Sequence, residues 1–187
     1  MPRETPPSPR LVPEVIESPK TADVLDVMTR AVFQAGVSWA QIAKNWDAYG
    51  RAFDGFDVER VARFGEADIE RVLAEPGILR MRRKVAATVA NAAALRDLVA
   101  EYGDFHRYVT SFPNYNAIAK DVKKRFSFMG DMNVWYLLFR LGERVPRFES
   151  WVTTIPGDHP RMREMVELAR ATGRSAEVTD SGSAADE

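Results

Sequence analysis

The chain has 187 residues and an apolar content of 45%, which is enough for one globular domain with a real core. It has no cysteine, which excludes disulfides, a thiol nucleophile and thiolate metal ligands, and two histidines are too few for a multi-histidine metal site. No apolar run approaches the ~20 residues of a membrane span, and the N-terminus lacks a secretory apolar region. We therefore expect a cytoplasmic protein without a metal ion or cofactor.

The net charge of −1 argues at first against a nucleic-acid partner. The acidic excess lies at the C-terminal end, however, where residues 174–187 hold four acidic residues and one basic residue, and the middle holds two basic clusters. These are Arg80, Arg82, Arg83 and Lys84, followed by Lys120, Lys123, Lys124 and Arg125. Such clusters bind DNA phosphates when they lie beside turns, but a charge run is more often a solvated helix face. Both interpretations stay open here.

Taken in order, the chain is predicted to be helical almost throughout. Residues 1–20 hold six of the eleven prolines and predict a flexible N-terminal arm. Apolar periodicity and capping residues predict helices over 22–35, 39–52, after Asp57, over about 66–74 and 80–102, after Asp104, and over 158–172. Residues 173–187 are polar and predict a disordered tail. Since strand patterns are nearly absent, we expect an all-α domain over 21–172.

The stretch 123–151 organises the rest of the chain. It predicts a hairpin near 120–142, in which Gly130 can adopt a positive φ and Asp131 suits the first turn of a helix. That helix would carry an apolar stripe over 134–141 and end at Gly142. Backbone N–H groups that open a helix are a ready site for a phosphate. The alternative is a plain helical hairpin within a core.

Two sequence motifs carry a family resemblance. The segment FQAGVSW over 33–39 resembles the QAG-L/V-SW signature of the DNA-3-methyladenine glycosylase I family, and KKRFSFMG over 123–130 is similar to its hairpin. Shorter matches between them extend the resemblance over roughly 24–142. It implies a helix-hairpin-helix DNA glycosylase fold. It also implies a monomeric, monofunctional enzyme of base-excision repair that flips a damaged base out of double-stranded DNA and hydrolyses its N-glycosidic bond.

The resemblance also implies roles for single residues. The turn at Gly36, Val37 and Ser38 would enter the base stack, and Trp39 would form a wall of the base pocket together with Phe33 and Trp46. Gly130 and the basic residues Lys123, Lys124 and Arg125 would hold the phosphates beside the flipped nucleotide. The alternatives are that Val37 packs its loop onto the core and that Trp39 is an ordinary core tryptophan.

Three positions depart from the family pattern. The family's first helix carries a Glu five residues before the Gly of the motif, which helps to recognise the extruded base, and here that position is Ala31. The cysteines and histidines of the family's zinc site are missing. The hairpin Lys that gives bifunctional relatives their lyase step corresponds to Met132, so no lyase activity is expected.

Glu149 could supply a replacement carboxylate. It lies seven residues after Gly142, the spacing at which endonuclease III-like members of the superfamily place a catalytic Asp. We expect its side chain in a pocket with Trp39, where a carboxylate would stabilise the sugar cation as the base leaves. The flanking Phe148 and Trp151 would raise its pKa by desolvation. The alternative is a surface glutamate paired with Arg144 or Arg147.

Three functions follow from these observations. The first is the DNA glycosylase. The second is a non-catalytic DNA-binding relative that has kept the scaffold and lost the chemistry, as the changes at Ala31 and the zinc site suggest. The third is a protein-interaction module without a DNA role, which the near-neutral charge allows.

Overall fold

The computed structural model describes residues 15–178, and all regular structure in this range is helical apart from one isolated bridge between Val145 and Glu177. The helices are α1 (Thr21–Gln34), α2 (Trp39–Lys44), α3 (Trp46–Ala52), the 3-10 turn η1 (Asp54–Phe56), α4 (Val58–Val61), α5 (Glu66–Ala74), α6 (Arg82–Tyr102), α7 (Phe105–Thr110), α8 (Tyr115–Arg125), α9 (Asp131–Arg140), α10 (Phe148–Val152) and α11 (Pro160–Ala171). The all-α prediction is confirmed. None of the described helices is both long enough and apolar enough to cross a membrane.

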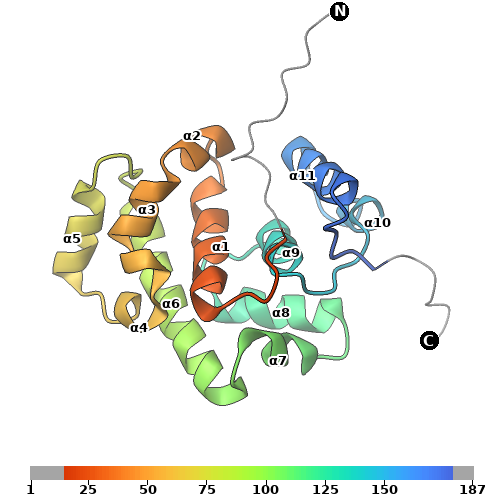
Figure 1. Cartoon of the computed structure of the whole chain (residues 1–187), viewed down its shortest axis with the longest axis horizontal. Helices are drawn as coiled ribbons and strands as arrows, with labels where there is room; N and C mark the ends of the chain where they lie inside the picture. The colour runs from red at the N-terminus through yellow and green to blue at the C-terminus, as the bar shows by residue number, and fades with distance from the viewer. Residues whose placement is uncertain (1–14, 179–187) are drawn as a thin grey trace, which may run out of the picture.

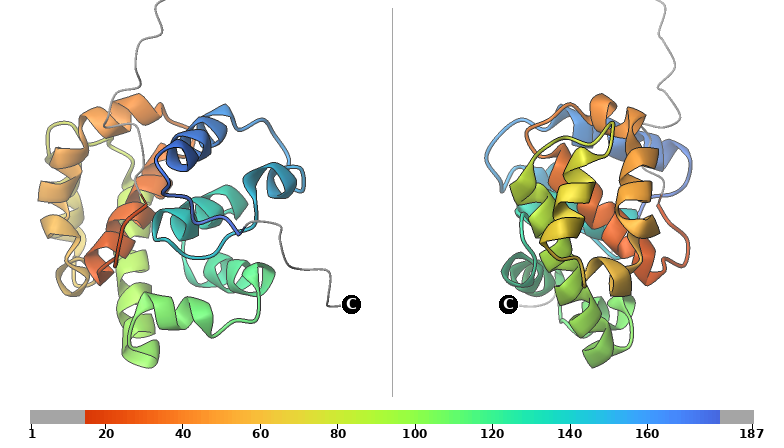
Figure 2. Two further views of the ribbon diagram at one scale, coloured as in Figure 1. Left: turned by 45° about the vertical axis from the view of Figure 1, so that its right-hand side comes forward. Right: turned by 90° about the vertical axis from the view of Figure 1, so that its left-hand side faces the viewer.

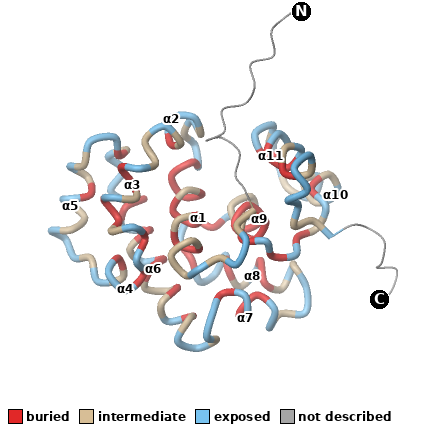
Figure 3. The backbone as a smooth tube through the Cα atoms, viewed as in Figure 1, coloured by how far each residue is buried: buried red, intermediate tan, exposed pale blue. Residues whose placement is uncertain are grey.

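Helix α1 runs through the middle of the fold. It packs on α6 and α9, and its side chains Leu25, Met28 and Val32 are completely buried. A helix that is apolar around most of its circumference is stable only when neighbours cover it on several sides. In Figure 1, α3, α5 and α6 lie on one side of α1, and α9 to α11 lie on the other. In Figure 3 most of α1 is red, the colour of buried residues.

The central helix packs on elements from both sides of the fold, and so does the long α6, which contacts α4 and α5 as well as α7. The views in Figure 2 show α3 and α5 together on one side of α1, and α8 and α9 on the other. Helix α9 buries Val134, Leu137 and Leu138 completely, as the apolar stripe in the sequence predicted. The end of α1 therefore lies between two packed halves, and this packing holds the start of the following turn in place.

The helix predicted over 39–52 is interrupted at Asn45, where the structure has two helices, α2 and α3. Asn45 adopts φ −106° and ψ 11°, and its side-chain amide donates to the carbonyl of Gln41 at 3.3 Å. Asn side chains favour such local bonds with the backbone over helical continuation. The break redirects the chain so that the Trp46 ring stacks on Tyr49.

The hairpin α8–α9 is tied to α6 by one buried side chain. Asn91 accepts a hydrogen bond from the N–H of Ser127 at 2.7 Å and donates one to its carbonyl at 3.1 Å. The positive φ in this turn falls on Phe128 at +59° and not on Gly130, which has φ −76°. The expectation of a left-handed Gly130 is therefore wrong. A side chain at Gly130 would meet nothing within 4 Å, so the residue leaves open space at the start of α9.

The ends of the described range are packed on the domain. The N–H of Ile16 donates to the carbonyl of Arg140 at 2.8 Å, so the C-terminal part of the expected N-terminal arm contacts α9. At the other end, Val178 donates to Val145, and Glu177 is hydrogen-bonded to the N–H of Phe148. The chain is thus ordered beyond the boundary predicted at 172. The rest of the predicted arm and tail, 1–14 and 179–187, lies outside the described residues.

Candidate functional site

The turn between α1 and α2 presents backbone and little else to its surroundings. Gly36 has φ +74°, which favours glycine, and a Cβ there would meet nothing within 4 Å. The N–H of Val37 donates to the carbonyl of Gln34 at 3.2 Å. Gly36 and Ser38 are exposed and Val37 is half-buried, so the tip of this turn is accessible while Val37 still contacts the core.

A buried lysine from a distant helix holds this turn in place. The ammonium of Lys84, in the first turn of α6, donates to the carbonyl of Ala35 at 2.6 Å and to that of Phe33 at 3.2 Å. Carbonyls at a helix C-terminus lack partners within the helix and attract cations. Burial lowers the pKa of Lys84, as expected for a desolvated ammonium. Lys84 therefore supports the end of α1 and is not part of a solvated basic face.

Trp39 begins α2 directly after the turn. It is half-buried, and its ring meets the ring of Tyr136 edge-to-face at 5.8 Å between centroids. Arg140, one turn further along α9, donates to the Tyr136 hydroxyl at 2.9 Å. A half-buried tryptophan that keeps part of its surface free, next to an accessible turn, is a suitable platform for stacking a planar ring.

The other two aromatic residues predicted for the base pocket occupy different places. Phe33 is fully buried and packs on Tyr49 and Phe53, so it belongs to the core and its predicted place in the pocket is wrong. Trp46 is half-buried and stacks on Tyr49 at 4.8 Å and on Phe56 at 5.6 Å. Its surroundings are polar on the side that faces α1.

Three polar side chains lie on α1 at positions 26, 30 and 34, one turn apart. The carboxylate of Asp26 accepts a hydrogen bond from the indole N–H of Trp46 at 3.2 Å and lies 3.9 Å from Nε of Arg30. The Arg30 guanidinium covers the Trp46 ring at 4.2 Å. Burial raises the pKa of Asp26 and lowers that of Arg30, so both charged forms are held at a cost. The side-chain oxygen of Gln34 is buried and has no hydrogen-bond partner in the described part of the chain.

The sequence interpretation missed Asp26 and Arg30. Their spacing of four residues within a mostly apolar helix was the available signal, because it places both on one face. Ala31, the position of the family Glu, is buried with 2% of its surface exposed, so α1 offers no carboxylate there. The polar side chains of Asp26 and Arg30 lie on a different face of the helix from Ala31.

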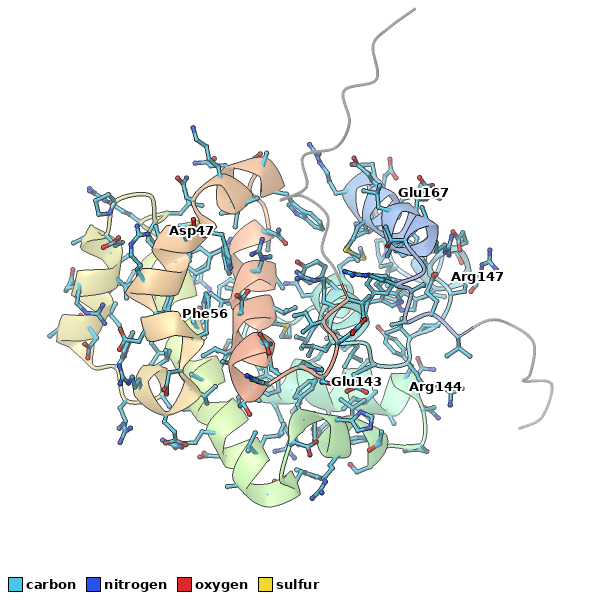
Figure 4. The ribbon with its side chains drawn as sticks, in the orientation of Figure 1. Asp47, Phe56, Glu143, Arg144, Arg147 and Glu167 are labelled. Atoms are coloured by element: carbon cyan, nitrogen blue, oxygen red, sulfur yellow. The ribbon has the colours of Figure 1, made fainter. Side chains whose placement is uncertain are left out.

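Glu149 does not take the position that we expected. It lies in α10, and its carboxylate accepts two hydrogen bonds from Arg170 at 2.7 Å and one from Arg147 at 3.2 Å. The bonds from Arg170 hold the pKa of Glu149 at about 2, below its usual value, where we expected it to be raised. The side chain is 42% exposed. Figure 4 shows Arg147 at the end formed by α10 and α11, across α1 from the Phe56 that Trp46 stacks on.

Consequently Glu149 is a partner in an ion-pair cluster. Arg170 also donates to Glu177 through Nε and Nη2, at 2.7 and 2.8 Å. This cluster fastens the segment 173–178 to α10 and α11. The geometry agrees with the alternative of a surface glutamate paired with arginine. Both carboxylate oxygens of Glu149 accept hydrogen bonds from arginines, namely Arg170 and Arg147.

The predicted phosphate-binding cluster is partly neutralised within the hairpin. Lys123 pairs with Asp131 at 2.6 Å, and Arg125 pairs with Asp121 at 2.6 Å. Lys124 is exposed and forms no ion pair within residues 15–178. Together with the open backbone at Gly130, Lys124 is the part of this cluster that is free for an outside anion.

These features define the class of protein. The chain has an all-helical glycosylase fold. This fold presents an accessible turn at the end of a buried helix, a half-buried tryptophan next to that turn, and a helical hairpin with open backbone. Solved structures agree: the chain is 25% identical to the 3-methyladenine DNA glycosylase I of Staphylococcus aureus with a TM-score of 0.61, over 69% of this chain and 80% of that one. Another structure of a 3-methyladenine DNA glycosylase I is 27% identical with a TM-score of 0.60, over 69% of this chain and 82% of that one.

Residues 19–140 match the model of the methyladenine glycosylase family, and the chain belongs to this family. It is 34% identical over 89 residues to the DNA-3-methyladenine glycosylase of Haemophilus influenzae, which covers 48% of each protein. It is 32% identical over 118 residues to DNA-3-methyladenine glycosylase 1 of Escherichia coli, which covers 52% of this chain and 63% of the other. The chain thus spans less than two thirds of either relative.

Proposed function

We propose that this protein is a monofunctional DNA N-glycosylase that removes an alkylated or otherwise damaged base from duplex DNA. The observation that carries the proposal is the turn over 35–38. Hydrogen bonds from Lys84 hold this turn in place, and the half-buried Trp39 follows it. A rigid, accessible tip beside a stacking platform suits the extrusion of a nucleotide from the base stack. Its relatives act on 3-methyladenine in DNA, as their names state.

In the proposed reaction the bond between C1′ of deoxyribose and the base breaks, and water supplies a hydroxyl to C1′ and a proton to the leaving base. Trp39 would stack on the flipped base, and Val37 would fill the gap left in the duplex. No protein nucleophile takes part, since Met132 occupies the position of the lyase lysine in bifunctional relatives. The product is therefore an intact strand with an abasic site.

The hairpin would hold the DNA backbone beside the extruded nucleotide. The first N–H groups of α9 have no partner within the helix, the open space at Gly130 leaves room for a phosphate, and Lys124 adds a positive charge. Lys123 and Arg125 contribute less because each already pairs with an aspartate. We further propose that the protein acts as a monomer on cytoplasmic, nucleoid DNA and needs no cofactor.

A second function is favoured by two observations on carboxylates. Glu149 is bound to Arg170 and Ala31 offers no carboxylate, so a protein that binds damaged DNA without cutting the glycosidic bond would have the same scaffold. Such a protein would protect or mark the lesion. The two functions differ in whether a free base appears.

The experiment that separates them is base release from duplex DNA methylated with dimethyl sulfate, with the released bases identified by chromatography and mass spectrometry. The glycosylase proposal expects free methylated bases and abasic sites. Trp39→Leu should reduce release by about 10-fold or more, the scale of one lost stacking contact. Tyr102→Leu is the matched control, because Tyr102 is a half-buried aromatic with one edge-to-face partner, Tyr108, in α7. DNA binding without base release would instead support the second function.

A further inference from the structure

Two of the three exposed large apolar side chains in residues 15–178 lie where α6 and the hairpin α8–α9 come together. Phe128, in the hairpin turn, is 40% exposed, and Met81, directly before α6, is 41% exposed; the third is Val178. The first turn of α6 reaches the hairpin through Arg83, whose guanidinium lies 5.9 Å from the centre of the Phe128 ring. An isolated exposed apolar residue is ordinary, so the backbone of Phe128 decides whether its exposure has a meaning.

The hairpin turn holds Phe128 in a conformation that a bulky residue rarely adopts. Its φ is +59°, in the left-handed region, where a side chain crowds the backbone and glycine fits without strain. The turn is nevertheless held on both sides. Asn91 is hydrogen-bonded to both backbone groups of Ser127, and the side-chain amide of Asn133 donates to the carbonyl of Phe128 at 2.7 Å. A strained aromatic residue that is kept partly in solvent indicates a contact outside the chain.

The charges next to Phe128 indicate the chemistry of that contact. Arg83 and Lys124 are exposed, and neither forms an ion pair within the part of the chain that the structure describes. The neighbouring Arg82, by contrast, is paired with two glutamates of α5. An apolar ring between unpaired cations is complementary to a polymer in which phosphates alternate with apolar sugar rings, which is a nucleic acid strand.

The start of α6 also connects this junction to the turn at the end of α1. Lys84, the residue after Arg83, donates to the carbonyl of Ala35 at 2.6 Å. A duplex that contacts both this turn and the hairpin therefore passes the start of α6. Phe128 and Gly130 are two residues apart, at most about 7 Å between Cα atoms, so a phosphate in the open space at Gly130 leaves the adjoining deoxyribose within reach of the ring.

We propose that Phe128 is a second apolar contact with DNA, separate from the turn over 35–38. Its ring packs on the deoxyribose next to the phosphate at Gly130, and Arg83 binds a neighbouring phosphate. The inference rests on the proposed function for the presence of DNA. Since sugar and phosphate are the same in every nucleotide, this contact does not depend on the lesion or the sequence. Phe128 is thus a positioning residue, which holds the duplex while the turn and Trp39 act on one nucleotide.

The first test measures the affinity of the full chain for an undamaged, fluorescein-labelled duplex by anisotropy, between ~50 and ~200 mM salt. Phe128→Gly removes the ring and suits the positive φ, so its helix content and Tm should stay close to those of the parent. We expect its affinity to fall by about 10-fold, the scale of one lost ring contact, with an unchanged salt slope because no charge is removed. Val178→Gly is the matched control, since Val178 has the same exposure and lies beside Val145; it should keep the parent's affinity. If Phe128→Gly does not fold, Phe128→Asn replaces it, because Asn also tolerates a positive φ.

The second test separates the cation from the ring. Arg83→Met should lower the affinity and reduce the salt slope by about one, as expected for one lost phosphate contact. Arg63→Met, at an exposed arginine between α4 and α5, is the control for the loss of one positive charge and should keep the slope. An Arg83→Met slope equal to that of the parent would contradict the assignment of Arg83.

The same duplex with a tetrahydrofuran abasic site distinguishes this contact from the base site. Phe128→Gly should weaken binding to both duplexes by the same factor, and a loss confined to the abasic duplex would overturn the inference. Parental affinity of Phe128→Gly would overturn it too, as would a parent dimer that this substitution dissociates in sedimentation, because the ring would then contact a second copy of the chain. If Phe128→Gly binds and releases methylated bases as the parent does, only this inference fails. A parent that binds no DNA at ~50 mM salt would end the proposed function as well.

Discussion

Substitution of Lys84 by Met should loosen the turn on which the proposed function depends. Met matches Lys in length and helix propensity, so the change removes the ammonium with little effect on packing. The two lost hydrogen bonds, at 2.6 Å to Ala35 and 3.2 Å to Phe33, are made by a charged donor. Bonds of this kind stabilise by about 1.5–3 kcal/mol each, and the desolvation of the buried ammonium offsets part of that sum. We expect a net loss of about 2–3 kcal/mol in the free energy of unfolding.

This loss corresponds to a fall in Tm of roughly 5–10 °C for a chain of this size. Urea unfolding followed by tryptophan fluorescence measures it, and Arg83→Met is the control. Arg83 is the exposed neighbour of Lys84 in α6, and its cation–π contact with Phe128 spans 5.9 Å, so its removal should cost less than about 0.5 kcal/mol. Base release at 25 °C, where Lys84→Met is still folded, should fall by about 10-fold or more because the turn is displaced. A Lys84→Met midpoint equal to that of the parent would refute the reasoning.

Four further substitutions test other parts of the structure. Glu149→Gln should lower stability by about 1 kcal/mol at pH 7, a value discounted because the side chain is 42% exposed, and leave base release unchanged. Its pKa is held at about 2, so the stabilisation is complete above its ordinary 4.5 and fades as the pH falls towards 2, which unfolding at pH 7 and pH 3 would show. Asn91→Leu removes two hydrogen bonds to the hairpin turn and should cost about 2 kcal/mol, with weaker DNA binding. Lys124→Ala should reduce the salt dependence of DNA binding by about one unit of slope, and Lys123→Ala by less, since Lys123 is paired. Equal slopes for the two lysine variants would contradict this difference.

The local features of the fold could be predicted from the sequence. Asp57 and Asp104 accept hydrogen bonds from backbone N–H groups three residues later, as their positions before apolar runs indicated. The apolar stripe of α9 is buried as predicted. These signals depend on neighbours within one turn, which the sequence order specifies directly. The family could be identified for the same reason, because its motif is a continuous run of residues.

The pairings between distant residues could not be predicted. Lys84 was read as one member of a basic run, but its partner carbonyls at 33 and 35 lie 51 and 49 residues away. Glu149 was assigned to the pocket by its spacing from Gly142, but its carboxylate is hydrogen-bonded to Arg170, 21 residues away. Spacing along the chain fixes where an element begins, but which face meets which neighbour depends on the packing of the whole domain. Roles assigned by spacing alone are therefore the ones that the structure changes.

The charges on α1 provide the last test, because both are held in the folded protein although burial disfavours them. Arg30 and Asp26 are 3.9 Å apart, too far for a hydrogen bond between them, and burial disfavours the charge on each. Incompletely paired charges of this kind can usually be replaced by neutral groups with no loss of stability. The variant Asp26→Asn with Arg30→Met keeps the acceptor for Trp46 and removes both charges, so we expect its unfolding free energy to match or exceed that of the parent by up to about 2 kcal/mol. Arg30→Met alone leaves Asp26 uncompensated and should be less stable than the double variant. A double variant that is markedly less stable than the parent would contradict this expectation and show that the pair stabilises the fold.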